Sequence, residues 1–385
     1  MIYYLSVKDY FAVLPIPEAG RECRTCRIFV KIEKMKFKDR FMEQQYTYME
    51  RLMERGSKFL NCRYPIICGA MTWVSEPNLV AAVCNNGGFG CLAGGNTPPD
   101  ILKNQIGELR KLTDKSFAVN LITIAPAYPD HIAMLKTLEQ PVPYIVFAGS
   151  IPKQGEIAAI KETGAKVICF ASTISIAERM IRYGADALVL EGTEAGGHIG
   201  HVSTTVLIQQ LLFKFGETLP IFVAGGIATG RMAAHLLLCG AAGIQMGTRF
   251  VMTDECLAHP RFKEYFSHAN ARDAMSTAQF DPRLPVVSVR VIRNHGTQEF
   301  TRLQLELVKQ VAEGTTTRQE AQAELEKFWV GSLRKAVVDG DVEYGSVMAG
   351  QSVGLMDKVL PVKEVIHEIL RDGEAELVKM KQFFN

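Results

Sequence analysis

From Tyr64 onward, short apolar runs alternate with longer segments whose apolar residues recur at helical spacing. Runs of this kind between helical segments are typical of the buried strands of a parallel sheet. The pattern predicts eight strands, at Pro65–Met71, Gly88–Ala93, Phe117–Ile122, Tyr144–Ala148, Lys166–Ala171, Ala187–Glu191, Pro220–Ala224 and Gly243–Met246. It predicts helices between them at Glu76–Asn85, Pro98–Leu112, Pro129–Leu138, Lys153–Thr163, Ile174–Tyr183, Val206–Phe215 and Thr229–Cys239.

Eight strand–helix units in succession indicate the α/β class and, within it, a (β/α)8 TIM barrel. The alternative is a doubly wound open sheet, which would carry a G-x-G-x-x-G turn after its first strand. The first strand ends Cys68-Gly69-Ala70-Met71 instead, so the pattern favours the barrel.

The domain organisation follows from where this alternation holds. Residues 1–50 lack it, are charged and rich in methionine, show no secretory signal pattern, and are predicted to be an N-terminal extension outside the core. The barrel is assigned to 51–253 and 346–385, with a last amphipathic helix over Val362–Phe384. Residues 254–345 are polar and helical, and we expect them to form a helical cap inserted after the last strands, over the barrel mouth.

Composition narrows the class of function. A net charge of +2 without a block of Lys and Arg argues against nucleic-acid binding. No apolar stretch reaches the roughly 18 residues that span a bilayer. The nine cysteines are odd in number and irregularly spaced, which predicts reduced thiols in a cytoplasmic protein. Cys23 and Cys26 form a C-x-x-C pair, but no second pair or nearby histidine completes a metal site, so none is predicted.

Glycine turns follow the last three predicted strands. They contain Gly197, then Gly225 and Gly226, then Gly247, which Thr248 follows. Ligands of (β/α)8 barrels bind at the carboxyl ends of the strands, and phosphate groups bind at the turns after strands seven and eight. Backbone N–H groups without a neighbouring Cβ can approach an anion closely. We therefore predict a phosphate-bearing ligand at Gly226, Gly247 and Thr248.

Further chemistry is predicted around that ligand. His198 follows the first of these turns and can give or take a proton near neutral pH; the alternative is a core histidine that orders its own loop. Asn96 and Asn120 are strand-end amides that both donate and accept, as the edge of a flavin ring requires. Asn120 could instead cap a loop. Met71 would pack on a planar ring or serve as ordinary core.

Four motifs together resemble one family. Residues 194–198 (Glu-Ala-Gly-Gly-His), 224–227 (Ala-Gly-Gly-Ile), 245–250 (Gln-Met-Gly-Thr-Arg-Phe) and 345–351 (Gly-Ser-Val-Met-Ala-Gly-Gln) are similar to those of the nitronate monooxygenase, or 2-nitropropane dioxygenase, family. This superfamily also contains the FMN-dependent enoyl-[acyl-carrier-protein] reductase II. The resemblance extends from about Phe59 to about Leu370.

The resemblance implies FMN as cofactor and His198 as the catalytic residue. Carried over by motif, the residues implied around FMN are Ala70, Met71, Asn96, Asn120, Gly149, Glu194, Gly197, Gly225, Gly226, Met246, Gly247, Thr248 and Gln351. The end of the first strand departs from the Gln-Gly-Gly-Met or Ala-Pro-Met sequence that members often carry. No metal is implied.

Three functions remain open at this point. The first is oxidation of nitronates by O2 to carbonyl compounds and nitrite, with His198 as the base for neutral nitroalkanes. It is ranked first because the segment 279–285 resembles bacterial nitronate monooxygenases. The second is NADH-dependent reduction of an enoyl thioester, in which His198 supplies a proton. The third is a non-catalytic flavin-binding protein. The presence of His198 beside the glycine turn argues against this function. The sequence leaves a homodimer open.

Overall fold

A computed structural model describes residues 46–383 except Asn96 and residues 285–287. The compact unit that it defines starts at Tyr46. The pair Cys23 and Cys26, and most of the predicted extension, lie outside the described residues. None of the helices within the described ranges is long and apolar enough to cross a membrane.

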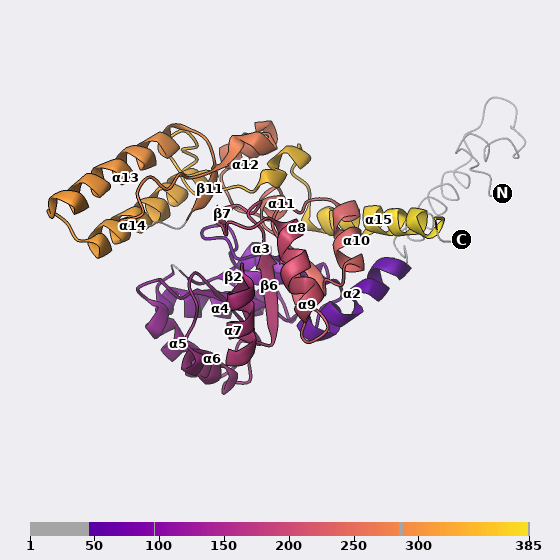
Figure 1. The fold of residues 1–385 in the computed structure, drawn as a ribbon. Coiled ribbons are helices and arrows are strands. Elements are labelled where there is room, and N and C mark those ends of the chain that lie inside the picture. The colour runs from indigo at the N-terminus through magenta and orange to yellow at the C-terminus, as the bar shows by residue number, and fades with distance from the viewer. Residues whose placement is uncertain (1–45, 96, 285–287, 384–385) are drawn as a thin grey trace, which may run out of the picture. The chain divides into compact units, whose positions relative to one another are not determined.

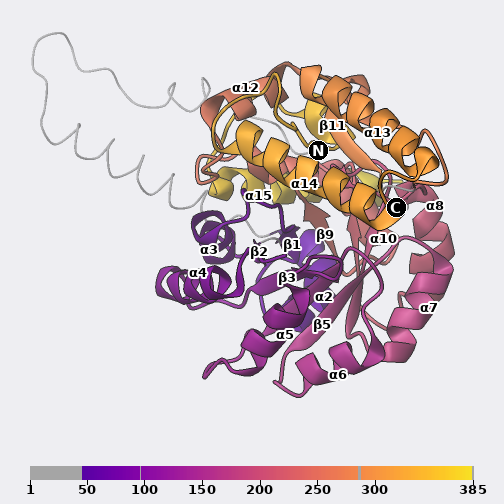
Figure 2. The same cartoon turned by 90° about the vertical axis from the view of Figure 1, so that its left-hand side faces the viewer.

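Eight parallel strands close into a barrel in the order β1-β2-β3-β4-β5-β6-β8-β9 (Figures 1 and 2). Their bounds are β1 Ile66–Cys68, β2 Phe89–Ala93, β3 Ala118–Ile122, β4 Tyr144–Ala148, β5 Lys166–Ala171, β6 Ala187–Glu191, β8 Ile221–Ala224 and β9 Gly243–Met246. The ring closes where Ile66 pairs with Ile244 and Cys68 pairs with Met246. The predicted (β/α)8 barrel is therefore confirmed, with a first strand shorter than predicted.

Helices cover the outside of the barrel (Figure 2). They are α3 Pro77–Asn85, α4 Pro99–Leu112, α5 Tyr128–Lys136, α6 Gln154–Lys161, α7 Ile174–Tyr183, α8 Thr204–Leu207, the π-helical turn η2 Ile208–Leu212, α9 Phe213–Phe215, α10 Gly230–Leu238 and α11 Thr248–Val251. Successive strand residues point to opposite faces of a sheet. Leu188 and Leu190 accordingly join the cluster that faces the helices, whereas Ala187 and Val189 join the cluster inside the barrel.

Helix α2, Thr47–Leu60, seals the end of the barrel at which the strands begin. Leu60 is fully buried in the cluster inside the barrel. The backbone carbonyl of Phe59 accepts hydrogen bonds from the Tyr144 hydroxyl at 2.6 Å and from the Lys166 ammonium at 3.0 Å. A cation at the carboxyl end of a helix also stabilises the helix dipole.

The amino end of α2 is held just as firmly. The carboxylate of Glu374 accepts hydrogen bonds from the backbone N–H groups of Tyr48 and Met49, which the helix itself leaves unpaired. The side chains of Tyr46 and Met49 are buried. The core therefore begins at Tyr46, and residues 46–50, which the sequence assigned to the extension, belong to it.

Residues 254–345 contain more than the helices that the sequence predicted. They form α12 Pro260–His268, the 3-10 turn η3 Ala271–Asp273, β10 Ala274–Ser276, β11 Val289–Ile292, α13 His295–Glu313 and α14 Arg318–Val337. Strands β10 and β11 form a three-stranded antiparallel sheet with β7, Gly197–His198, from the loop after β6. Helices α13 and α14 run side by side as an antiparallel pair (Figures 1 and 2).

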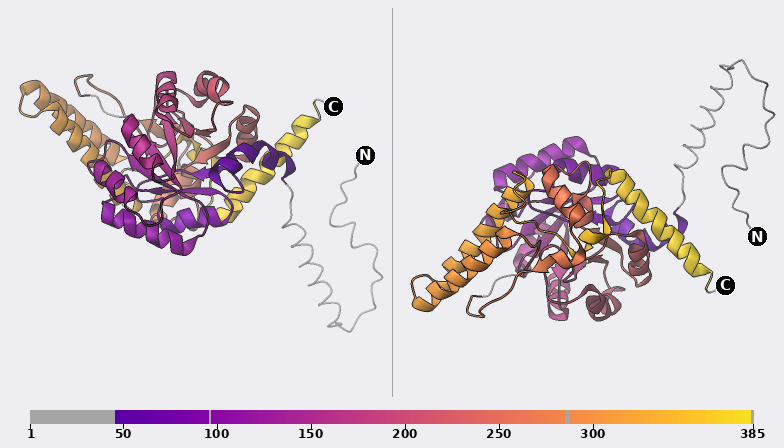
Figure 3. Two further views of the ribbon diagram at one scale, coloured as in Figure 1. Left: turned by 90° about the horizontal axis from the view of Figure 1, so that it is seen from below. Right: turned by 90° about the horizontal axis from the view of Figure 1, so that it is seen from above.

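The chain returns to the barrel after α14. The 3-10 turn η4, Gln351–Leu355, precedes α15, Val362–Lys381, which packs against α10 and α2 (Figure 3). Gly230 and Gly373 allow this close contact, because a Cβ at Gly230 would lie 2.1 Å from the backbone oxygen of Ile369. The last amphipathic helix predicted from the sequence is therefore present and docks on the outside of the barrel.

The burial of Met49 gives a test of the amino-terminal boundary. We expect Met49→Ala to lower the free energy of unfolding by about 2–5 kcal/mol, because it leaves a cavity between α2 and α15. The exposed neighbour Arg51, changed to Ala, should alter it by less than about 0.5 kcal/mol. Urea denaturation of the full chain measures both values, and equal small effects would show that α2 is not part of the core.

Candidate active site

The barrel is open to solvent at the carboxyl ends of its strands. In β2, β3, β4 and β6 every residue is buried except the last, which is half-buried. The inner side chains at this level include Ala93 and Ala148, which are small, together with Ile122 and Glu191. Solvent therefore reaches the ends of these strands, where two of the inner side chains are alanines.

The turns after β8 and β9 lie side by side on this rim. Ala224 pairs with Gln245, so the turn that contains Gly226 and the turn that contains Gly247 leave neighbouring points of the barrel rim. Gly226 has a φ of 72°, in the left-handed region that favours glycine. Within the described ranges, the backbone N–H groups of Gly226, Gly247 and Thr248 donate no hydrogen bond. Three free donors on neighbouring turns suit an anion.

The segment after the cap braces these turns. The Thr248 hydroxyl accepts a hydrogen bond from the Gly350 N–H at 3.0 Å. The backbone oxygen of Glu194 accepts one from the Gln351 N–H at 2.9 Å. Glu194 also lies against Gly226, where an added Cβ would come within 3.0 Å of the Glu194 Cβ. The loops after β6, β8 and β9 and residues 350–351 therefore form one packed group.

The carboxylate of Glu194 is used within its own loop. It accepts hydrogen bonds from the backbone N–H of Thr204, at 3.1 Å, and from the Thr204 hydroxyl, at 2.8 Å. These contacts fix the start of α8 and fold the loop back on itself. Arg290 adds a second brace, because its guanidinium donates to the backbone oxygens of Thr193 and Ala274. The loop that carries His198 is thereby tied to the cap.

His198 stands where the barrel loop meets the cap. Strand β7 pairs with β11, with His198 opposite Val289. Its side chain is 43% exposed, and its Nε2 lies 3.7 Å from a carboxylate oxygen of Glu326 on α14. The alternative of a core histidine is therefore wrong, because the imidazole is exposed to solvent.

Glu191 is a polar residue at the rim that the sequence analysis did not single out as a site residue. It continues the inward-facing positions Ala187 and Val189 of β6, so its side chain points into the barrel mouth. None of the hydrogen bonds and ion pairs among the described residues uses its carboxylate. Burial raises the pKa of Glu191 to about 8, so the carboxyl is mostly neutral at pH 7.

The other predicted residues divide into those near the paired turns and those further away. Met71 lies against Gly247, whose Cβ would come within 3.3 Å of the Met71 sulfur. Asn120 is buried inside the barrel, where its amide donates to the backbone oxygen of Val146 at 3.1 Å. Met246 packs into the layer between strands and helices, which leaves its backbone on the rim side.

The remaining predicted positions are at strand ends. Ala70 follows β1 and packs on the cluster inside the barrel, and Gly149 follows β4 with a φ of 92°. Gly197 and Gly225 also have positive φ, of 74° and 100°. Asn96 lies outside the described residues.

The fold and this rim define a class: a (β/α)8 barrel with a cap and two neighbouring glycine turns whose N–H groups are free. The sequence model of the nitronate monooxygenase family matches residues 53–372. The chain belongs to the nitronate monooxygenase family, a family of oxidoreductases.

Individual relatives match over most of their own length. The (3aS,4S,5R,7aS)-5-hydroxy-7a-methyl-1-oxo-octahydro-1H-indene-4-carboxyl-CoA dehydrogenase of Mycobacterium tuberculosis is 30% identical over 85% of this chain and 98% of its own. A probable nitronate monooxygenase of Staphylococcus saprophyticus is 31% identical over 59% of this chain and 76% of its own. The structure of FabK from Thermotoga maritima is 38% identical, with a TM-score of 0.75, over 86% of this chain and 98% of its own.

The raised pKa of Glu191 predicts a pH dependence of stability. Between about pH 4.5 and 8 this carboxyl is ionised in the unfolded chain but neutral in the folded protein, so rising pH favours unfolding. Glu191→Gln removes this loss. We expect its stability advantage over the wild type to grow from pH 5 to pH 8, measured by denaturation of protein dialysed free of small ligands.

A control separates this effect from the general titration of the protein. Glu139 is exposed, and Glu139→Gln should track the wild type at every pH. A Glu191→Gln curve parallel to the wild-type curve would contradict a neutral carboxyl at the barrel mouth.

Proposed function

We propose that this protein is an FMN-dependent oxidoreductase that reduces or oxidises carboxylic thioesters and exchanges electrons with NADH. The observation that carries the cofactor is the set of free N–H groups on two adjacent turns at the rim. The observation that favours the thioester is the match to a carboxyl-CoA dehydrogenase at 30% identity over 98% of its length, whereas two probable nitronate monooxygenases match over 76% and 91% of theirs. The thioester function is therefore ranked above nitronate oxidation, whereas the sequence motifs ranked nitronate oxidation first.

The residues at the rim fit FMN. Gly226, Gly247 and Thr248 would hold its phosphate, because their N–H groups are free and no Cβ occupies the space above the glycines. Met71 and Asn120 would border the ring system from β1 and β3. The other residues that the family resemblance assigns to FMN are Ala70, Asn96, Gly149, Glu194, Gly197, Gly225, Met246 and Gln351. When bound, FMN would supply the two-electron chemistry.

The protein's own part in the reaction is to position the substrate and move a proton. His198 is exposed beside the rim and is attached to both the barrel loop and the cap. In the reducing direction its imidazole would give a proton to the thioester as hydride arrives at the neighbouring carbon; in the oxidising direction it would take that proton. The imidazole lies at the junction of the barrel loop and the cap, where a substrate held between them would reach it.

Nitronate oxidation by O2 is the second candidate. It is favoured by the relatives named as probable nitronate monooxygenases. In this reaction His198 would remove the acidic proton of a neutral nitroalkane, and O2 would take the place of NADH as the electron-transfer partner. The same residues would hold FMN, so the two candidates differ in the substrate and in the electron donor or acceptor.

Gly247→Ala tests the FMN site. The added methyl group would lie 3.3 Å from the Met71 sulfur and project toward the proposed phosphate, so we expect FMN affinity to fall at least tenfold. Gly107, on α4, is the matched control, because a Cβ there meets nothing within 4 Å. Fluorescence titration of flavin-free protein with FMN gives both constants. A wild-type protein without affinity for FMN would overturn the proposed cofactor.

Anaerobic mixing with NADH separates the two candidate functions. We expect NADH to bleach the bound flavin rapidly and an enoyl-CoA to restore its colour. His198→Gln should slow the second step by about 10²-fold or more, as loss of a general acid does, and leave the first unchanged. A flavin that NADH does not bleach, but that turns over a nitronate in air, would instead support the monooxygenase.

A further inference from the structure

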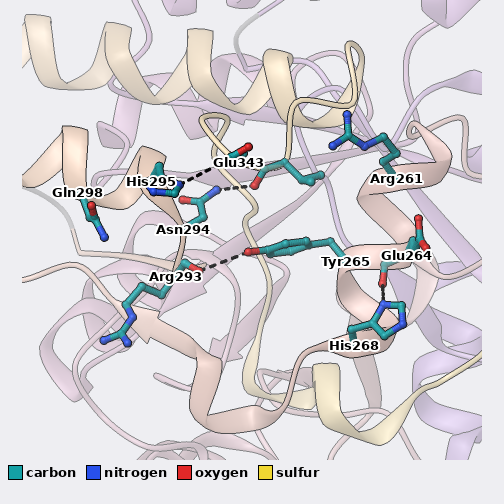
Figure 4. A pocket seen from close by; sticks show the side chains of 10 residues that line it. Arg261, Glu264, Tyr265, His268, Arg293, Asn294, His295, Gln298 and Glu343 are labelled. Carbon is teal, nitrogen blue, oxygen red and sulfur yellow. Dashed lines mark hydrogen bonds and ion pairs between the residues drawn. The ribbon is translucent and has the colours of Figure 1, made fainter.

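A cavity lies among the residues of the cap, and no strand of the barrel contributes to its lining. It has a volume of about 600 Å3 and lies between α12 and the start of α13, with residues 342 and 343 on a third side (Figure 4). This size is within the range of small-molecule sites. None of the residues assigned to FMN or to proton transfer lines it.

Two arginines line this cavity without a partner. Arg261 comes from α12 and Arg293 from the end of β11 (Figure 4). Among the described residues, neither guanidinium forms a hydrogen bond or an ion pair. Arginine binds phosphate groups with two parallel hydrogen bonds, and an unpaired guanidinium is free to do so. The cavity therefore offers two phosphate-binding groups from separate elements.

The walls of the cavity are held by other contacts. The Asn294 amide donates to the backbone oxygen of Val342 at 2.7 Å, and His295 forms an ion pair with Glu343 at 3.2 Å. Tyr265 adds an aromatic ring, and its hydroxyl donates to the backbone oxygen of Arg293 at 3.5 Å (Figure 4). The carboxylate of Glu264 also lines the cavity and has no partner among the described residues.

This combination matches a nucleotide better than a simple anion. The two guanidinium groups lie on opposite sides of the cavity (Figure 4), and each suits a phosphate group. The Tyr265 ring offers a surface on which a base can stack, and a carboxylate such as that of Glu264 accepts hydrogen bonds from ribose hydroxyls. We propose that the cavity in the cap binds an adenosine diphosphate group and that this group belongs to the CoA of the thioester substrate. The second part rests on the thioester function proposed above.

The spacing along the cap sheet favours CoA. Val289 pairs with His198, and Arg293 lies four residues further along the chain, which is about 13 Å in an extended strand. The pantetheine arm between the diphosphate and the sulfur of CoA contains thirteen bonds and reaches about 15 Å at the span per bond of an extended chain. In NADH one ribose separates the diphosphate from the nicotinamide, which is a shorter reach.

The test uses the FMN-loaded full chain and three purified ligands: CoA, ADP and NADH. In the double variant Arg261→Gln and Arg293→Gln, we expect calorimetry to show at least tenfold weaker binding of CoA and ADP. The matched control is Arg318→Gln, an exposed arginine at the start of α14, which should bind both as the wild type does. Circular dichroism and flavin content check that the double variant is folded.

Steady-state kinetics add a second readout. The double variant should raise KM for an enoyl-CoA about tenfold with kcat little changed, and should leave an N-acetylcysteamine thioester, which lacks the nucleotide, unaffected. Unchanged binding of CoA and ADP in the double variant, or an equal loss in the Arg318 control, would contradict the proposal that the cavity binds a nucleotide. Loss of NADH binding with CoA binding intact would overturn the assignment to CoA.

Failure of the proposed function has a different signature. A wild-type enzyme that binds CoA in an Arg261- and Arg293-dependent manner, but never turns over a thioester, would leave the nucleotide cavity standing and remove its role as a substrate site. Normal turnover of enoyl-CoA with an unchanged KM in the double variant would contradict the CoA site in the cavity. The proposed thioester function would still hold.

Discussion

Closure of the barrel between β1 and β9 is the constraint on which the site depends. The two strands are far apart in the chain, and their ladder, extended by the Gly69 N–H bonded to the Met246 oxygen, brings all eight strand ends to one rim. A parallel ring also makes neighbouring turns level with each other. The neighbouring positions of the two glycine turns are a direct result, since their free N–H groups come from both turns.

The rim is completed by segments that return to it from a distance. Gly350 and Gln351 follow the cap in the chain, yet they hydrogen-bond to Thr248 and to Glu194. Strand β7 pairs with a strand of the cap, and Arg290 ties the two together. The imidazole of His198 therefore depends on both the barrel and the cap for its position, and a movement of the cap would move it relative to the rim.

Prediction from the sequence succeeded where the signal is local and repeated. Eight apolar strands between helices indicate the barrel, because burial on both faces requires continuous apolar runs. The short strands β10 and β11 were missed since each is stabilised by pairing with a distant segment rather than by its own pattern. Glu191 was identified as the end of β6, but its place as an unpaired carboxyl in the mouth depends on the apolar walls that other strands provide.

The sequence by itself determined the barrel, the location of its glycine turns and the presence of a histidine beside them, because hydrophobic periodicity and glycine are local properties of the chain. Tertiary structure decided that α2 seals the barrel and that the core begins at Tyr46. It also decided that the Glu194 carboxylate accepts hydrogen bonds from Thr204, and that Arg261 and Arg293 line one cavity. Each of these depends on contacts between residues far apart in the chain, whose free energies come from burial and geometry that no local pattern contains.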